Sequence, residues 1–297
     1  KQYAKEKELQ IVGDIPIYVA LDSADVWSHP ELFQLDEENL TPLKVSGVPP
    51  DAFSEDGQLW GNPLYDWEKM EQTDFAWWRS RMKASAELYD AVRIDHFIGV
   101  VQYYAIPYGA VTAKDGEWEK GPGKKLTDAL DEAAGETKII AEDLGVFCQE
   151  VKDLLAETGY PGMKIIEFAF SGDRFNEHLP HCYDPNSVVY GGTHDNETLA
   201  GDFKPEKRQW WALQYFADYL GAAHQSEVLD RVFRAAYGSV ASVAIFQMQD
   251  VLKLDNWARM NTPGTLGENW RWRLVPGQFT DERADYLSWL VDTFGRF

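Results

Sequence analysis

Three carboxylates stand where short apolar segments of the sequence end. Asp95 closes the segment VRID, Glu142 closes KIIAE and Asp195 closes VVYGGTHD, and successive carboxylates lie roughly 50 residues apart. If these segments are parallel strands, this spacing of one or two strand–helix units brings all three side chains to the same rim. Cleavage of a glycosidic bond requires paired carboxylates around an oxocarbenium-like transition state. The placement therefore predicts chemistry on a sugar.

The neighbours of Asp95 and Glu142 predict different protonation states. Side chains alternate along a strand, so Arg93 lies on the same side as Asp95 and keeps that carboxylate ionised, as a nucleophile requires. Glu142 follows apolar residues near other carboxylates, which raises its pKa and suits a general acid. Each also has a structural alternative. Asp95 can cap the next helix with Arg93 as its partner, and Glu142 with Asp143 can form a solvated strand end.

His194 and Asp195 form the third candidate pair. The imidazole can hydrogen-bond a sugar hydroxyl, while Asp195 can stabilise positive charge or bind vicinal hydroxyls. No metal site is expected, because the nearby sequence has no helical HxxxH segment and no Cys-rich partner set. Neither GxGxxG nor GxxxxGKS/T occurs, so nucleotide-dependent chemistry loses support and no cofactor is expected.

The amino-acid composition limits the kinds of molecule that this protein is expected to bind. The 297 residues carry a formal net charge of -21, which makes phosphate-rich nucleic acids and anionic membranes poor partners and favours a neutral ligand. No run of 18 apolar residues occurs, so no segment is expected to span a membrane. The two cysteines, Cys148 and Cys182, do not indicate a disulfide framework. With no apolar signal-like stretch at the N-terminus, a cytoplasmic protein is expected.

Six apolar runs alternate with helical patterns at 75–90, 147–159 and 206–221, which indicates an α/β fold. With acidic residues at strand ends, the leading architecture is a (β/α)8 TIM barrel, and a doubly wound open sheet is the alternative. The runs are IVGDIPIYV (11–19), YDAVRIDHF (89–97), TKIIAEDLG (137–145), GMKIIEFAF (162–170), SVVYGGTHDN (187–196) and ASVAIFQMQ (241–249).

A closed barrel of this kind has eight strands, and KQYAKEKELQ at the start reads like the end of a charged helix. We therefore expect residues 1–297 to be a partial catalytic barrel that lacks its N-terminal strands. Long insertions at about 20–74 and 98–136 follow what would be the third and fourth barrel strands. Their Trp, Tyr and Phe content predicts substrate-binding walls rather than disorder.

At these residues the sequence resembles the amylomaltases, or 4-α-glucanotransferases (disproportionating enzymes), relatives of the α-amylase superfamily. The resemblance implies that Asp95 is the nucleophile, Glu142 the acid/base and Asp195 the stabiliser of the transition state. It also implies that Arg93 and His194 hold the sugar at the cleavage site. The matching blocks run across nearly the whole chain: GDIPIYVALDSADVW, GVPPDAFSEDGQLWGNPLYDW, RIDHF, AEDLG, GTHDNET and NTPGTLGENWRWR.

The block PPDAFSEDGQLWG resembles the segment that arches over the acceptor region in amylomaltases. The resemblance implies that this path is lined by Asp51, Phe53, Gln58 and Trp60. Packing of the loop is an equal alternative for Trp60. Asp14 matches a position near the site, with a structural role as its alternative. WRWR (270–273) is expected to brace the end of the barrel, with contact to glucan as its alternative. Complete amylomaltases also carry an N-terminal segment with the first barrel strands, which makes such a segment a candidate partner of this chain.

The function implied by the resemblance is transfer of α-1,4-glucan segments to the 4-hydroxyl of an acceptor glucan or glucose, by retaining double displacement. Maltooligosaccharides and other α-1,4-glucans are then the ligands. Two alternatives stay open. An α-glucan hydrolase of the α-amylase type would use the same carboxylates, and a non-catalytic glucan-binding fragment would need only the aromatic residues. Without the upstream strands the barrel is not expected to close in the usual way, so inactivity of this chain alone is a further alternative.

Overall fold

The computed structural model describes residues 1–51, 54–146 and 148–297. The chain divides into two compact units, Lys1–Gly162 (unit 1) and Met163–Phe297 (unit 2), and each is described by itself. Each of the six apolar runs contains a strand, and each of the three helical patterns contains a helix. The prediction of an α/β fold with parallel strands is therefore confirmed.

Unit 1 contains a parallel three-stranded sheet in the order β1-β4-β7. Its middle strand is buried at every position, as expected of a strand covered on both faces. These strands are β1 (Val12–Ile15), β4 (Ala91–Ile94) and β7 (Lys138–Ala141). The helices of this unit are α1 (Gln2–Glu6), α2 (Ala24–Ser28), α3 (Trp67–Gln72), α4 (Ala76–Leu88), α5 (Ile98–Val101), α6 (Lys124–Ala134) and α7 (Gln149–Thr158), with the 3-10 turn η1 (Pro30–Leu32).

The two insertions contain a second sheet that the sequence pattern did not reveal. Antiparallel strands from both insertions pair in the order β3-β2-β5-β6. They are β2 (Lys44–Val48), β3 (Gln58–Pro63), β5 (Gln102–Pro107) and β6 (Glu117–Lys120). The outermost strands β3 and β6 are largely exposed, so they lack the apolar runs by which the other strands were recognised. The insertions thus contain a folded sheet rather than long loops alone, and their role as substrate-binding walls stays a prediction.

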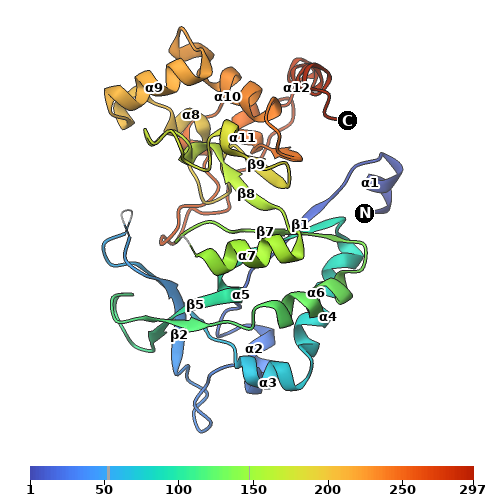
Figure 1. The fold of residues 1–297 in the computed structure, drawn as a ribbon, viewed down its shortest axis with the longest axis vertical. Coiled ribbons are helices and arrows are strands. Elements are labelled where there is room, and N and C mark those ends of the chain that lie inside the picture. Colours follow the sequence, from blue (N-terminus) through green and yellow to red (C-terminus); the bar gives the residue numbers. More distant parts are fainter. Residues whose placement is uncertain (52–53, 147) are drawn as a thin grey trace. The chain divides into compact units, whose positions relative to one another are not determined.

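Helices α4 and α6 lie side by side in unit 1 (Figure 1). Helix α6 lies between two glycines with positive φ and buries Leu126 and Leu130, while α4 buries Trp78 and Met82. All four side chains belong to one apolar core that also contains the strand residues of the parallel sheet. This core fixes the sheet whose strand ends carry two of the predicted catalytic residues.

Unit 2 contains the three-stranded sheet β10-β9-β8, in which β9 and β10 are parallel. Its strands are β8 (Gly162–Ile165), which begins at the unit boundary, β9 (Ser187–Tyr190) and β10 (Val243–Ile245). Its helices are α8 (Leu199–Asp202), α9 (Trp210–Leu220), α10 (Val228–Tyr237), α11 (Met248–Val251) and α12 (Asp281–Phe294). Its 3-10 turns are η2 (Ile166–Phe168), η3 (Pro180–Cys182), η4 (Pro205–Lys207), η5 (Gln225–Glu227) and η6 (Asn256–Ala258).

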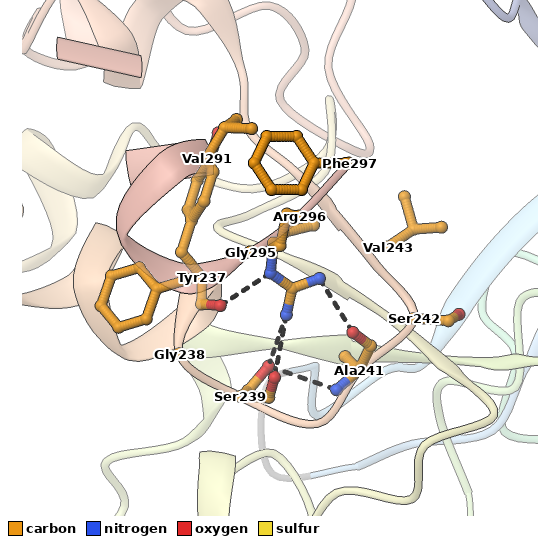
Figure 2. Close-up of a pocket in the computed structure, with 12 residues that line it drawn as sticks. Tyr237, Gly238, Ser239, Ala241, Ser242, Val243, Val291, Gly295, Arg296 and Phe297 are labelled. Carbon is orange, nitrogen blue, oxygen red and sulfur yellow. Dashed lines mark hydrogen bonds between the residues drawn. The ribbon is translucent and has the colours of Figure 1, made fainter. Parts of the chain in front are cut away.

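Arg296, just after α12, anchors this helix to the segment between α10 and β10 (Figure 2). Its guanidinium donates hydrogen bonds to the backbone carbonyls of Tyr237 at 2.7 Å, Ala241 at 2.9 Å and Ser239 at 2.9 Å. These residues line a pocket of about 530 Å³. Because the guanidinium bonds so many carbonyls, we assign it a structural role.

Both cysteines are free thiols that form no disulfide, with Cys148 buried and Cys182 half-buried. Among the described residues, no helix is both long and apolar enough to cross a membrane.

Candidate active site

The C-terminal ends of the parallel strands in unit 1 bring four of the predicted site residues together. In the strand register Asp14 of β1 pairs with Arg93 of β4, so both side chains lie on one face. Asp95 follows β4 directly and Glu142 follows β7 directly. The prediction that Asp95 and Glu142 share a sheet edge is confirmed, and Asp14 and Arg93 lie beside them.

Arg93 is the centre of this group. One guanidinium nitrogen donates to both Asp14 carboxylate oxygens, at 2.7 and 2.8 Å, and the other donates to Asp95 Oδ1 at 2.9 Å. The Arg93 side chain is only 10% exposed. Burial acts to lower the pKa of Arg93, but the charges of Asp14, Asp95 and Glu142 outweigh it and raise that pKa. A cation held in this way favours the charged form of Asp95.

Glu142 is buried, and its surroundings favour the protonated, neutral form of the carboxyl. Burial first, and then the negative charge of Asp95, raise the pKa of Glu142 to about 8, against the opposing effect of Arg93. Backbone N–H groups also oppose the rise: His96 donates to Oε2 at 2.5 Å and Leu144 donates to Oε1 at 3.2 Å. Burial therefore outweighs the neighbouring cation, and Glu142 is mainly protonated at neutral pH, as a general acid must be.

The separation of the two carboxyl groups bears on the stereochemistry. One Arg93 nitrogen lies 2.9 Å from Asp95 Oδ1 and 3.9 Å from Glu142 Oε2. Those two oxygens are therefore no further apart than the sum of these distances. This limit on one oxygen of each carboxyl is compatible with the about 5–5.5 Å separation of the carboxyl groups in retaining pairs.

The pKa of Glu142 predicts a pH-dependent stability change. Because the folded pKa of about 8 lies above the ordinary 4.5, the neutral form stabilises the fold below pH 4.5, and this contribution is lost as the pH rises through 8. Replacing Glu142 by the neutral Gln should therefore raise the unfolding temperature at about pH 9 by several degrees and change it little at about pH 4. Thermal unfolding at both pH values measures this. Glu87→Gln on the exposed face of α4 is the control, and an equal shift at both pH values would contradict the assignment.

Of the residues in the first insertion, Trp60 on β3 lies close to this group. Its ring meets that of His96 edge-on, with centroids 4.8 Å apart and planes at 84°, and its indole N–H donates to Gln58 Oε1 at 3.1 Å. Trp60 is nevertheless 38% exposed. Trp60 thus packs against the site and also keeps ring surface open, so its predicted role as a stacking platform stays a prediction. The exposed Asp51 accepts a hydrogen bond from the Ser54 backbone N–H at 2.7 Å.

Phe53, the remaining predicted residue of this segment, lies outside the described residues.

In unit 2, His194 and Asp195 are neighbours in space as well as in sequence. His194 Nε2 lies 3.5 Å from Asp195 Oδ2. Asn261 donates to Asp195 Oδ1 at 2.6 Å, and the guanidinium of Arg259 donates to the Asp195 backbone carbonyl at 2.6 Å. The Asp195 side chain is therefore oriented from one side and open on the other, with 46% of it exposed. That Asp195 joins Asp95 and Glu142 stays a prediction.

The sequence analysis missed the residues that hold this pair. Asn261 and Trp270 belong to the block NTPGTLGENWRWR, which was recognised only as a motif. The Trp270 ring lies 5.0 Å from that of His194, and its backbone φ of 63° is in the left-handed region. The first residue of WRWR therefore contacts a predicted site residue, while the expectation that WRWR braces the end of a barrel stays a prediction.

Glu167, in the 3-10 turn η2 two residues after the end of β8, is a fourth carboxylate near a strand end, and it was not among the predicted site residues. Its Oε2 atom is buried and, within the described ranges, has no hydrogen-bond partner. Burial and the charge of Asp202 raise the pKa of Glu167 to about 8, against a hydrogen bond from the Asn196 side chain. Asn196 in turn accepts a hydrogen bond from the Thr193 backbone at 2.8 Å. Glu167 is thus linked to the turn that carries Asp195, and the run KIIE was its only sequence signal.

Among the residues that the structure describes, no group of three or more His, Cys, Asp or Glu side chains is arranged to hold a metal ion. The chemistry available on these residues is that of carboxylates, an imidazole and a buried guanidinium.

The family model described as 4-alpha-glucanotransferase matches residues 1–278. The chain belongs to the 4-alpha-glucanotransferase family. It is 50% identical to the 4-alpha-glucanotransferase of Clostridium butyricum over 301 residues, covering 100% of this chain and 61% of that relative. The resemblance that the sequence motifs indicated is therefore confirmed.

Solved structures agree with the 4-alpha-glucanotransferase assignment. The amylomaltase from Streptococcus agalactiae in complex with acarbose matches with a TM-score of 0.95 and 41% identity, over 100% of this chain and 59% of that one. The alpha-amylase from Geobacillus thermoleovorans, complexed with acarbose, matches at 0.56 and 11% identity over 100% of this chain and 60% of that one, which shows a shared fold alone. The chain spans about 60% of the length of these relatives.

In this member of the 4-alpha-glucanotransferase family, Asn261 offers a matched test of the Asp195 environment. Asn261→Asp keeps the shape but places a second carboxylate against Asp195 Oδ1, which it now contacts at 2.6 Å as a donor. Two adjoining carboxylates disfavour their ionised forms, so we expect glucan transfer to fall about 10- to 100-fold at neutral pH. Initial rates with maltotriose measure this. Asn39→Asp in an exposed turn is the control, and an unchanged rate for Asn261→Asp would refute the role of this contact.

Proposed function

We propose that the protein of which this chain forms at least a part is a 4-α-glucanotransferase that moves α-1,4-glucan segments to the 4-hydroxyl of an acceptor glucan or glucose. The proposal rests on two carboxyl groups beside Arg93 whose surroundings favour different protonation states. Asp95 bonds a buried cation, whereas burial raises the pKa of Glu142 to about 8. A nucleophile and an acid in different protonation states are the two groups that a retaining mechanism needs.

In the first step, Asp95 attacks the anomeric carbon while Glu142 gives its proton to the departing glycosidic oxygen. This releases the reducing-end part of the donor and leaves a glycosyl ester on Asp95. In the second step Glu142, now a carboxylate, takes the proton of the acceptor 4-hydroxyl as that oxygen attacks the anomeric carbon. The ester bond to Asp95 breaks and both residues regain their starting states. One glycosidic bond is broken and one is formed, so no water is consumed.

The other predicted residues support this pathway. Asp195, oriented by Asn261, would stabilise the positive charge of the oxocarbenium-like transition state. Arg93 and His194 would hold the sugar at the cleavage point. We assign Asp14 to the support of Arg93, since both its carboxylate oxygens accept from that guanidinium.

The acceptor path is proposed to run along the first insertion. Trp60, with 38% of its surface exposed, would stack on a sugar ring, and Gln58 holds its indole N–H. Asp51 and Phe53 are proposed to line the same path. Exclusion of water along this path would favour a sugar hydroxyl over water as the second-step nucleophile.

The architecture proposed for residues 1–297 is part of a (β/α)8 barrel, to which β1, β4, β7, β8, β9 and β10 contribute strands. The walls at about 20–74 and 98–136 are inserted between them. In support, the strands of the β1-β4-β7 sheet are parallel, β9 and β10 are parallel, and the predicted catalytic residues follow strands at their C-terminal ends. Maltooligosaccharides and other α-1,4-glucans are the proposed ligands; the amylomaltase of Streptococcus agalactiae was solved with acarbose.

Incubation of the complete protein with maltotriose tests this function. A transferase converts maltotriose to glucose and a ladder of longer oligosaccharides with no net gain of reducing ends. A steady rise in reducing ends would instead favour the α-glucan hydrolase. Binding of maltooligosaccharides without any change in their lengths would favour the non-catalytic alternative and refute the proposal.

A further inference from the structure

His96, the residue after Asp95, has an unusual backbone. Its φ of 48° lies in the left-handed region, which a non-glycine residue adopts only at an energetic cost. In this conformation the His96 N–H donates to Glu142 Oε2 at 2.5 Å, and the next N–H, of Phe97, donates to the Glu142 backbone carbonyl at 2.9 Å. Strained residues that persist at a functional site are usually held by their surroundings for a purpose. Here the strain directs two successive donors at Glu142.

The His96 ring is the second feature. Its Nε2 atom is buried and has no hydrogen-bond partner among the described parts of the chain. Burial lowers the pKa of His96 to about 4, so the ring is neutral at any pH near 7. Its neighbour is Trp60, whose ring it meets edge-on with centroids 4.8 Å apart. A neutral imidazole can make this aromatic contact without placing a second cation beside Arg93.

The two oxygens of Glu142 are not equivalent. Oε2 faces the His96 N–H at 2.5 Å and the Arg93 guanidinium at 3.9 Å, and both groups only donate. Oε1 faces the Leu144 N–H at the longer distance of 3.2 Å. Donors stabilise unprotonated oxygen, so a proton on the carboxyl favours Oε1 over Oε2. The catalytic proton would then leave from Oε1.

We propose that His96 is a positioning residue that joins Trp60 to Glu142: its left-handed backbone fixes Oε2 as an acceptor and leaves the transferable proton on Oε1, while its ring fixes Trp60. The proposal rests on the function proposed above. His96 thus has two separable roles: its backbone N–H orients Glu142, and its imidazole ring orients Trp60. An ordinary core histidine would have neither effect on the reaction.

Three substitutions separate the tasks. His96→Gly and His96→Asn both remove the imidazole but accept a left-handed backbone readily, whereas His96→Ala removes it and retains the steric cost. The contact with Trp60 is therefore lost in all three variants. The N–H bond to Glu142 is weakened only in His96→Ala, because this variant keeps the steric cost of the left-handed backbone but loses the packing of the ring against Trp60 that offsets that cost in the parent.

We expect the KM for the acceptor glucose to rise about fivefold in all three variants, the value of one aromatic pair. Only His96→Ala should move the alkaline limb of kcat/KM for maltotriose, upward by about one pH unit, since loss of an N–H donor disfavours the carboxylate form of Glu142. In the His96→Gly background, Trp60→Ala should add little to the acceptor KM, because the two side chains act together. The pH–rate profiles and acceptor titrations are measured on the complete protein, with thermal unfolding to confirm folding.

Equal pH profiles for His96→Gly and His96→Ala would overturn the backbone role, and an unchanged acceptor KM in all three variants would overturn the ring role. If His96→Ala does not fold, the acceptor titrations of the Gly and Asn variants still decide the ring role. For the backbone role, a kcat/KM alkaline limb in these two variants that departs from the parent's would count against it. A parent protein that transfers no glucan refutes the proposed function itself, which is a different result from a transferring parent whose His96 variants are unaffected.

Discussion

Asp95→Asn is expected to reduce glucan transfer from maltotriose by at least about 10³-fold, because the amide cannot form the glycosyl ester of the first step. The substitution keeps the shape of the side chain, and the amide oxygen can still accept from Arg93, which now donates to Asp95 Oδ1 at 2.9 Å. The fold should therefore persist while the chemistry is lost. Transfer rates from maltotriose, measured together with unfolding temperature, test this.

Asp22→Asn, an exposed carboxylate in the segment after β1, is the matched control and should leave transfer unchanged. A glucanotransferase that keeps more than about a tenth of its rate with Asn at position 95 has another nucleophile. In that case Asp95 would be the structural partner of Arg93 that the sequence analysis kept as an alternative.

Glu142→Gln is the second large effect, and its size should depend on the donor. With maltotriose the departing oxygen needs a proton, so the rate should fall about 10²–10⁴-fold. With an α-glycosyl fluoride the leaving group departs without a proton, so glycosylation of the enzyme should be nearly retained. The release of fluoride in a pre-steady-state burst measures that first step.

The comparison between donors is the test of the role of Glu142. Equal losses with maltotriose and with the fluoride would mean that position 142 positions or folds the site rather than supplying a proton. Glu87→Gln, on the exposed face of α4, should affect neither donor.

The pH dependence follows from the same residue. Glu142 must be protonated in the first step, and its pKa of about 8 places the alkaline limb of kcat/KM near that pH in the free enzyme. Two effects compete here: burial and Asp95 favour the neutral acid, whereas Arg93 and two backbone N–H groups favour the carboxylate. Because these effects together leave the pKa at about 8, both the protonated and the ionised form of Glu142 are accessible near neutral pH. The same side chain can therefore act as an acid in the first step and as a base in the second.

Much of unit 1 could be predicted because its determinants are local. Each strand of the β1-β4-β7 sheet lies in a short apolar run, and the alternation of side chains along VRID places Arg93 beside Asp95 without any tertiary information. The raised pKa of Glu142 was also expected from apolar neighbours and nearby carboxylates. These inferences need only strand periodicity and the rule that parallel strands end at one edge.

What could not be predicted depends on contacts between distant segments. The antiparallel sheet pairs strands from two insertions, and its outer strand β3 is exposed, so no apolar run marks it. Asn261 lies 66 residues beyond the Asp195 carboxylate that it bonds. The neutral ring of His96 is set by burial against Trp60, which the motif RIDHF does not reveal. Contacts between residues so far apart in the sequence cannot be inferred from local sequence patterns and are known only from the folded structure.

The most direct test of the central assignment is to capture the covalent intermediate. Glu142→Gln in the complete protein is treated with α-maltotriosyl fluoride, whose leaving group needs no acid, while the missing base slows release of the sugar. Intact mass should then rise by one maltotriosyl unit, and peptide mapping should place the ester on Asp95. A protein that turns over the fluoride without any such adduct, or an ester on a different carboxylate such as Asp14, would contradict the assignment of Asp95 as the nucleophile.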